Sequence, residues 1–155
     1  MDRRALTLPL YAAAGKGYHS SDGGLRWTEI SQTLPDDDSL YSIQLDPRNS
    51  KILYGILGNE GLSRSMDGGQ HWSTIQNNLP TNWVTAFAID PYNSSRLYAG
   101  SVDKGIFMST NRGQSWTEFN SGLTTRSITI LLANPRQPGC LYAGTQYGGV
   151  FSTCR

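Results

Sequence analysis

The chain has 155 residues, with 13 Lys and Arg against 12 Asp and Glu, so the formal net charge at pH 7 is +1. A length near 150 suits one domain, and a charged fraction of only 16% argues against an acidic disordered segment or a nucleic-acid-binding protein. No apolar run approaches the roughly 18 residues of a membrane span. The 17 glycines, eight tyrosines and four tryptophans indicate turns and strands.

The first residues, MDRRALTLPLYAAAGKG, have the order of a signal peptide: two arginines, a short apolar run, then small residues. The same run also fits the first strand of the repeat described next, and we interpret it as that strand. We expect a secreted or otherwise extracytoplasmic location, although we recognise no convincing signal peptide in this sequence.

A repeat with a period near 44 residues runs through the chain. Tyr54, Tyr98 and Tyr142 are spaced 44 residues apart, as are Trp72 and Trp116. An incomplete earlier copy precedes them. A period of 40–50 residues with four short strands in each unit is typical of a β-propeller blade. The sequence therefore predicts an all-β protein, a β-propeller with about 3.5 blades.

Each unit divides into four predicted strands, A to D. Strand A is the most apolar, as expected for an innermost strand covered on both faces. Strand B carries a Leu-Tyr pair, and strand C follows a Gly-rich turn. Strand D begins at a Trp and carries polar residues such as Glu29 and Glu118, which discourage pairing at a sheet edge. The predicted A strands are 40–45, 83–89 and 127–133, and the predicted C strands are 17–20, 61–65, 105–109 and 149–153.

These strands group into a blade fragment at 5–35, blades at 39–80 and 83–122, and a blade fragment at 126–155. The first unit lacks strand A and the last lacks strand D, whereas propellers usually have 4–8 complete blades. Three explanations stay open at this point. Two copies complete one ring as a homo-oligomer, the sequence is part of a longer propeller, or a strained four-bladed ring closes on itself.

The connection between strands C and D repeats the pattern Ser-x-Asp-x-Gly-x-x-Trp. An Asp or Asn oxygen can accept hydrogen bonds from backbone N–H groups further along the turn. Glycine supplies the positive φ, and the Trp ring is available for burial. We therefore expect these residues to be structural rather than catalytic. The three copies are Ser20, Asp22, Gly24 and Trp27, then Ser65, Asp67, Gly69 and Trp72, then Ser109, Asn111, Gly113 and Trp116.

This pattern resembles the Asp-box, or BNR repeat, of sialidase-like propellers. It is also similar to the propellers of photosystem II assembly factors, sortilin-type receptors and xyloglucan-degrading hydrolases. Three copies over nearly the whole chain make the resemblance specific for the fold. The resemblance is weak for function, because these relatives do different things on one scaffold.

An enzyme of this fold would be a glycoside hydrolase, which needs two carboxylates about 5–10 Å apart. The resemblance to sialidases implies a Phe/Tyr-Arg-Ile-Pro sequence near the start, which this chain lacks. The glutamates are Glu29, Glu60 and Glu118, and we expect the first and last on outer strands. Whether the protein is an enzyme stays open. We favour a non-catalytic protein and assign no catalytic residue.

Loops at one face offer side chains suited to binding. An exposed aromatic ring beside polar groups can stack on a sugar or contact a peptide, although a solvated turn or a packed inner-strand Trp would account for the same residues. We predict a non-catalytic scaffold whose loop face recognises a protein or glycan; the alternative is a fragment of a sialidase-like or xyloglucanase-like hydrolase. The candidate ligand-binding residues are Asp36, Asp37, Asp38, Asn82, Trp83, Asp103, Arg126 and Tyr147.

Cys140 and Cys154 lie symmetrically about Tyr147, at the tip of a predicted hairpin. They could form a cross-strand disulfide, which would suit an oxidising compartment, or be two free thiols near a frayed end. No Cys and His spacing resembles a zinc site, since His19 and His71 are isolated. We expect no metal, no cofactor, no nucleic-acid partner and no membrane span.

Overall fold

The computed structural model describes residues 9–34, 38–58, 60–80 and 83–154. Its described residues form four antiparallel sheets, and neighbours along the chain are neighbours in each sheet. The first sheet contains β1 (Leu10–Ala14), β2 (Lys16–Ser20) and β3 (Thr28–Glu29). The second contains β4 (Leu40–Asp46), β5 (Asn49–Leu57), β6 (Gly61–Ser65) and β7 (Ser73–Thr74). The third contains β8 (Val84–Ile89), β9 (Leu97–Ser101), β10 (Ile106–Ser109) and β11 (Thr117–Glu118), and the fourth β12 (Ile128–Ala133), β13 (Cys140–Thr145) and β14 (Gly149–Cys154).

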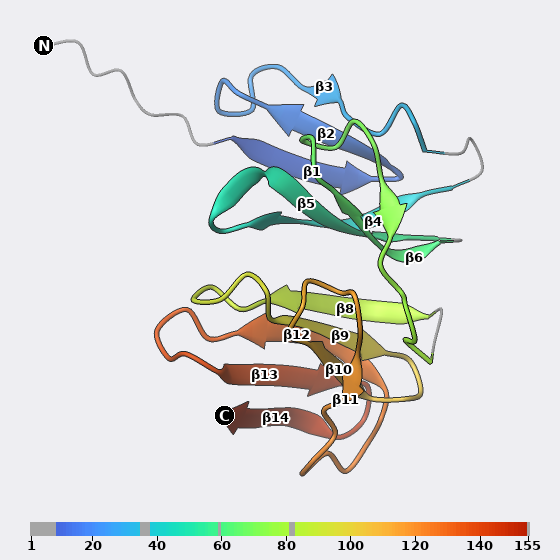
Figure 1. The fold of residues 1–155 in the computed structure, drawn as a ribbon, viewed down its shortest axis with the longest axis vertical. Helices are drawn as coiled ribbons and strands as arrows, with labels where there is room; N and C mark the ends of the chain where they lie inside the picture. The colour runs from blue at the N-terminus through green and yellow to red at the C-terminus, as the bar shows by residue number, and fades with distance from the viewer. Residues whose placement is uncertain (1–8, 35–37, 59, 81–82, 155) are drawn as a thin grey trace, which may run out of the picture.

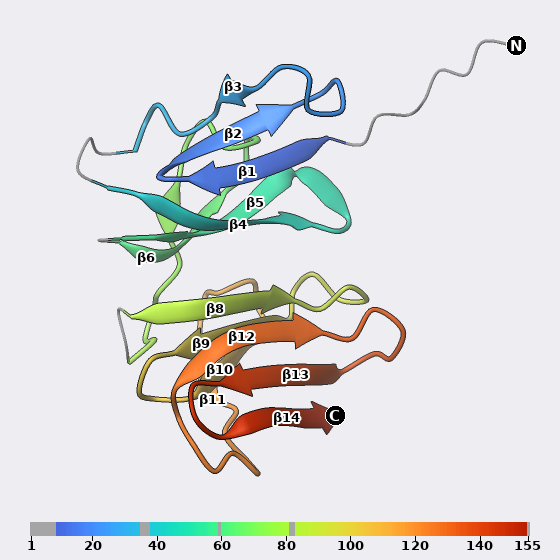
Figure 2. The same cartoon turned by 180° about the vertical axis from the view of Figure 1, so that it is seen from behind.

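The sheets pack face to face in sequence order, so that β1 and β14 lie at opposite ends of the stack in both ribbon views (Figures 1 and 2). The strands that begin the last three sheets are neighbours, β4 beside β8 and β8 beside β12. This arrangement is that of a partial β-propeller with short radial sheets. The predicted all-β propeller fold is therefore confirmed.

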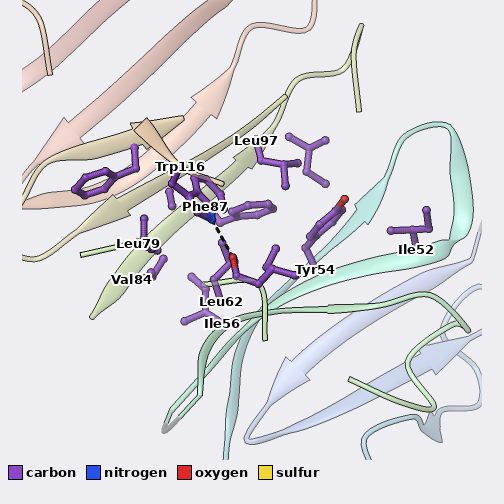
Figure 3. Close-up of a cluster of buried hydrophobic side chains, with 13 residues drawn as sticks. Ile52, Tyr54, Ile56, Leu62, Leu79, Val84, Phe87, Leu97 and Trp116 are labelled. Carbon is purple, nitrogen blue, oxygen red and sulfur yellow. Dashed lines mark hydrogen bonds between the residues drawn. The ribbon is translucent and has the colours of Figure 1, made fainter. Parts of the chain in front are cut away.

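The largest apolar cluster fills the interface between the second and third sheets (Figure 3). Tyr54 and Phe87 face one another across it with ring centroids 5.3 Å apart. A second cluster between the third and fourth sheets contains Tyr98, Leu131 and Leu141. Burial of these large side chains between successive sheets stabilises each sheet through its neighbours.

Three β-bulges occur at equivalent places in the innermost strands. The pairing register shifts between Leu40 and Ser42 in β4, between Val84 and Ala86 in β8, and between Ile128 and Ile130 in β12. The extra residues are Tyr41, Thr85 and Thr129, spaced 44 apart. A bulge re-aims a side chain and increases local twist.

An Asp or Asn side chain closes the turn after each of these three innermost strands. Its oxygen accepts a hydrogen bond from the backbone N–H two residues further along the chain. Asp46 accepts from Arg48 N, Asp90 from Tyr92 N and Asn134 from Arg136 N, each at 2.8 Å. The equivalent side chains form the Asx turns that such positions favour. Asp46 also accepts from Ser94 Oγ at 2.8 Å, which ties the second sheet to the third.

One expectation about strand A is wrong for the last sheet. Strand β12 was expected to be buried on both faces, but Ile130 and Leu132 are 61% and 57% exposed. Within the described residues no further sheet covers that face. The equivalent residues of β8, Ala86 and Ala88, are buried against the fourth sheet.

Candidate functional site

We call two kinds of loop together the loop face: the segments that lead into the innermost strands, and the turns between the second and third strands of each unit. One backbone hydrogen bond joins the two kinds of loop in three sheets. The donors Gly58 N, Val102 N and Gln146 N bind the carbonyl oxygens of Ser39, Trp83 and Ser127 at 2.9, 3.3 and 3.1 Å. The loops are therefore held together by the scaffold rather than by ligand.

Trp83 is the most prominent side chain of the described loop face in the third sheet. It is 72% exposed and lines a shallow pocket with Pro80, Val102, Asp103 and Lys104. An open indole beside a carboxylate and an ammonium can stack on an apolar face while the charges orient polar groups.

The turn that carries Asp103 and Lys104 is fixed from several sides. Lys104 N donates to Ser101 Oγ at 2.8 Å, and Lys104 O accepts from Asn120 Nδ2 at 3.2 Å and from Arg126 Nη1 at 3.4 Å. Asp103 and Lys104 also form an exposed ion pair at 3.7 Å. The structure thus brings Trp83, Asp103 and Arg126 together around one turn.

The other candidates are separate from this group. Asp38 is only 4% exposed, and its Oδ1 accepts from Ser39 N at 2.8 Å. Tyr147 is 87% exposed at the tip of the β13–β14 turn in the fourth sheet. Asp36, Asp37 and Asn82 lie outside the described residues.

Sequence reasoning missed Tyr41. Tyr41 is 69% exposed, and a side chain at Gly58 would meet both its ring and the Asp38 carboxylate. The signal that could have found it is its 44-residue spacing from Thr85 and Thr129.

The Asp-boxes form the same hydrogen-bonded turn three times. In the second box, Ser65 Oγ donates to Asp67 Oδ1 at 2.8 Å and accepts from Gly69 N at 2.8 Å. Asp67 Oδ1 also accepts from His71 N at 2.9 Å. The corresponding bonds are present around Asp22 and around Asn111. These contacts give the polar side chains of the boxes hydrogen-bond partners within the protein, so their positions are explained without a ligand.

Hydrogen bonds stabilise the charged form of the two box aspartates. The N–H of Arg26 and then the Ser20 hydroxyl lower the pKa of Asp22 from its ordinary value of 3.8. The N–H of His71, followed by the His71 ring and the Ser65 hydroxyl, lowers the pKa of Asp67 further. The His71 ring nitrogen lies 2.6 Å from Asp67 Oδ2.

The described carboxylates are widely distributed. Glu29 is on the outer strand β3, 3.8 Å from Lys16 Nζ, and Glu118 is on the outer strand β11. Among the carboxylates that the structure describes, only Glu60 and Asp103 combine exposure with a position on the loop face. Among the residues that the structure describes, no group of three or more His, Cys, Asp or Glu side chains could hold a metal ion.

Cys140 and Cys154 face each other as a directly opposed pair of β13 and β14 and are joined by a disulfide. The bond closes a 14-residue separation at the edge of the last sheet. No helix in the described part of the chain has the length and hydrophobicity to cross a membrane.

The fold and its three boxes define an Asp-box β-propeller. The family model described as Sortilin-Vps10 (sortilin, neurotensin receptor 3) matches residues 60–154, more than half of the chain. The chain therefore belongs to the Sortilin-Vps10 family. The resemblance to Asp-box propellers is confirmed.

Solved structures support the same fold. An ancestral GH74 enzyme superposes with a TM-score of 0.73 at 20% identity, covering 94% of this chain and 21% of that one. The GH74 xyloglucanase of Xanthomonas campestris gives 0.70 at 18% identity, covering 94% and 27%. YCF48 bound to D1 peptide gives 0.57 at 17% identity, covering 74% and 37%.

The chain spans about a quarter of the length of the two GH74 chains. A search of curated proteins gives no match. At these identities the neighbours establish the fold, and fold alone does not establish function.

Proposed function

We propose that the chain is a non-catalytic propeller module that recognises a protein or glycan through its loop face. The observation that carries this proposal is the 72% exposed Trp83 indole, set between Val102 and the Asp103–Lys104 turn. Aromatic rings in such positions contribute much of the binding energy in protein interfaces. The rigid turn lowers the entropy lost on binding.

Two structural neighbours support the choice of ligand classes. One is a peptide-bound propeller, YCF48 with D1 peptide, and the other is a xyloglucanase. Both ligand classes present a flat or extended surface on which an indole can stack. A glycan array that includes xyloglucan oligosaccharides, together with a displayed peptide library, separates the two classes.

The variant that tests the proposal is Trp83→Ala. We expect at least a tenfold loss of affinity for the selected ligand, measured by calorimetry. Met66→Ala is the matched control, because Met66 is 62% exposed at a variable position within the second Asp-box and away from the loop face. Equal losses in both variants, or no loss in Trp83→Ala, would contradict the proposal.

The second candidate is that the chain is a fragment of a carbohydrate-active hydrolase. Glu60 and Asp103 on one face favour it, since glycoside hydrolysis uses two carboxylates. The test measures turnover of xyloglucan and sialoside substrates by the native chain and by two variants. One variant is Asp103→Asn, and the other replaces Asp36, Asp37 and Asp38 together. A binding protein shows no turnover as the native chain or as a variant. Turnover by the native chain that is lost in these variants would establish the hydrolase.

We also propose that the propeller is completed outside this chain, by a second copy or by further blades of a longer propeller. The exposed apolar side chains of β12 support this, because exposed apolar patches mark interaction surfaces. Light scattering on the 155-residue chain tests the first option. A mass near twice 17.0 kDa supports the dimer, and a monomer excludes it for this chain.

A further inference from the structure

The edge of the stack opposite the loop face carries the β4–β5, β8–β9 and β12–β13 turns and the three Asp-box turns. We call this edge the turn face. Figures 1 and 2 show the first three turns one after another along one side of the stack. In two sheets a backbone hydrogen bond holds the box against the neighbouring turn, from Gly68 N to Lys51 O at 2.8 Å and from Arg112 N to Ser95 O at 3.0 Å. The two kinds of turn therefore form one continuous surface.

Four exposed cationic side chains lie on the turn face. None of them forms an ion pair with another described residue, so their charges are available to a partner. Three belong to the turns or to the strand that follows, and one belongs to the third box. They are Arg48, Lys51, Arg136 and Arg112.

The carboxylates of the turns are buried and used by the fold. Asp46 and Asp90 are each 2% exposed, and both close the Asx turns described above. Asp90 is also paired with Arg96, with Oδ2 and Nη1 3.2 Å apart. These two acidic groups therefore contribute little negative charge at the surface.

The boxes add little free negative charge to this part of the surface. In the second box Asp67 is paired with His71. The third box has Asn111 in place of Asp, so Arg112 has no carboxylate in its own box. The turn face of the last three sheets is therefore positively charged, although the net charge of the chain is only +1.

Side-chain hydrogen bonds join the three turns into a row. Arg48 Nη2 donates to the carbonyl oxygen of Tyr92, and the Tyr92 hydroxyl donates to the carbonyl oxygen of Pro135 at 3.0 Å. Pro135 directly precedes Arg136, so the row has a cation at each end and the 41% exposed Tyr92 ring between them. Sheets that pack face to face are about 10 Å apart, which separates the two cations by roughly 20 Å.

We propose that the turn face binds an anionic polysaccharide. Arg48, Arg112 and Arg136 bind its carboxylate or sulfate groups, and Tyr92 stacks on a sugar ring between them. A guanidinium binds such groups through two parallel N–H donors, and an aromatic ring offers an apolar surface that a sugar ring can cover. This site lies on the opposite edge from the loop face and does not depend on the function proposed above.

The spacing of the cations favours a polysaccharide over a nucleic acid. Double-stranded DNA carries one charge per about 1.7 Å of its axis and is bound through many phosphate contacts. The cations at the two ends of the row are roughly 20 Å apart, which suits a polymer that is charged only on some of its sugars. The Cys140–Cys154 disulfide suits an oxidising compartment such as the cell exterior, which agrees with the same ligand.

The experiment measures binding of three polysaccharides to the 155-residue chain by calorimetry. They are sulfated heparin, polygalacturonate with its carboxylates, and uncharged dextran. We expect heparin, polygalacturonate or both to bind, and dextran not to bind. Binding should weaken as NaCl rises from about 50 to 300 mM, because salt screens exposed charges. A preference for either polyanion supports the proposal and identifies sulfate or carboxylate as the bound group.

The test variant combines Arg112→Gln with Arg136→Gln. Within the described part of the chain both residues make hydrogen bonds only through their backbones, so folding should be unaffected. We expect affinity to fall by about tenfold or more, because two charge-assisted contacts are lost. The matched control combines Lys16→Gln with Lys104→Gln, which removes the same charge near the opposite edge. Its affinity should change by less than about twofold.

Two further variants test the aromatic ring. Tyr92→Phe keeps the ring and loses the hydrogen bond to Pro135, whereas Tyr92→Ala loses both. We expect Tyr92→Phe to bind like the native chain and Tyr92→Ala to bind several-fold more weakly. Equal losses in these two variants would exclude stacking on the ring.

Other results would overturn the proposal as a whole. Equal losses in the test variant and the lysine control would assign the binding to general charge and not to the turn face. Dextran binding as tight as heparin binding, or no binding of either polyanion at about millimolar concentration, would exclude a site for an anionic polysaccharide. Tighter binding of a DNA duplex or of phosphatidylglycerol vesicles at the same salt concentration would assign the turn face to a different class of partner.

Discussion

The indole Nε1 of Trp116 donates a hydrogen bond to the carbonyl oxygen of Ile75, which directly follows β7 of the preceding sheet, at 2.9 Å. In the first two boxes the same atom of Trp27 and Trp72 donates within its own box. The same sequence position therefore closes a local turn in two copies and joins two sheets in the third. The third ring is also the most deeply buried of the three: Trp27 is 45% exposed, Trp72 is half-buried and Trp116 is 3% exposed.

Alanine at Trp116 should destabilise the protein far more than alanine at Trp27. Loss of a buried Trp leaves a cavity and should lower the free energy of unfolding by about 3–5 kcal/mol. The half-exposed Trp27 should contribute roughly 1 kcal/mol. Urea unfolding of both variants measures the difference. Similar losses would show that the two rings contribute alike, contrary to their burial.

Adjacent glycines in the second box should tolerate alanine unequally. Gly68 and Gly69 have φ of 78° and 97°, so alanine at either is strained by about 1–2 kcal/mol. A Cβ at Gly69 would also lie 2.6 Å from Cδ1 of Ile30, whereas one at Gly68 meets nothing within 4 Å. Gly69→Ala should therefore lose about 1–3 kcal/mol more than Gly68→Ala. Equal thermal midpoints for the two variants would refute this steric argument.

The box aspartates should make the stability of the protein fall in acid. Their folded-state pKa values are lowered below the ordinary 3.8, so their contribution is fully present above about pH 4 and is lost as pH falls through the folded pKa. Replacing both Asp22 and Asp67 by Asn copies the uncharged third box at Asn111. We expect urea midpoints between about pH 4 and 2 to depend less on pH in this double variant. An unchanged acid dependence would assign the effect to other carboxylates.

Reduction of the Cys140–Cys154 disulfide should loosen the last sheet. Closing a loop of about 15 residues contributes about 3 kcal/mol in the chain-entropy model. Dithiothreitol should therefore lower the thermal midpoint and speed amide hydrogen exchange in β13 and β14. The control is Cys140→Ser with Cys154→Ser, which should unfold like the reduced protein and not respond to dithiothreitol. A reductant effect in this control, or none in the native chain, would contradict the prediction.

The sequence alone was sufficient for the repeat and for most strand positions. The predicted A strand at 40–45 is β4 at Leu40–Asp46, and the predicted C strand at 61–65 is β6. This accuracy has a physical reason: Gly, Asn and Pro mark every turn, and three copies of one pattern reinforce each other. The D strands, in contrast, are only two residues long, because the Asp-box turn uses the residues before them.

Burial on the loop face could not be predicted in the same way. Asp38 and Asp103 are both acidic residues in loops of that face, yet one is 4% exposed and the other belongs to the exposed group. Gly58, which is 20 positions further along the chain, lies close to the Asp38 carboxylate and to Tyr41, and the local sequence does not report this contact. The exposure of Ile130 likewise depends on the absence of a covering sheet among the described residues, which local sequence does not report.

The three β-bulges at Tyr41, Thr85 and Thr129 bear on how the chain arose. A bulge is an irregularity that strand pairing does not require, and here it recurs at the same position in successive units while the inserted side chain changes from Tyr to Thr. We infer that one ancestral unit already contained the bulge before it was duplicated, and that the copies diverged in side chain while they inherited its backbone.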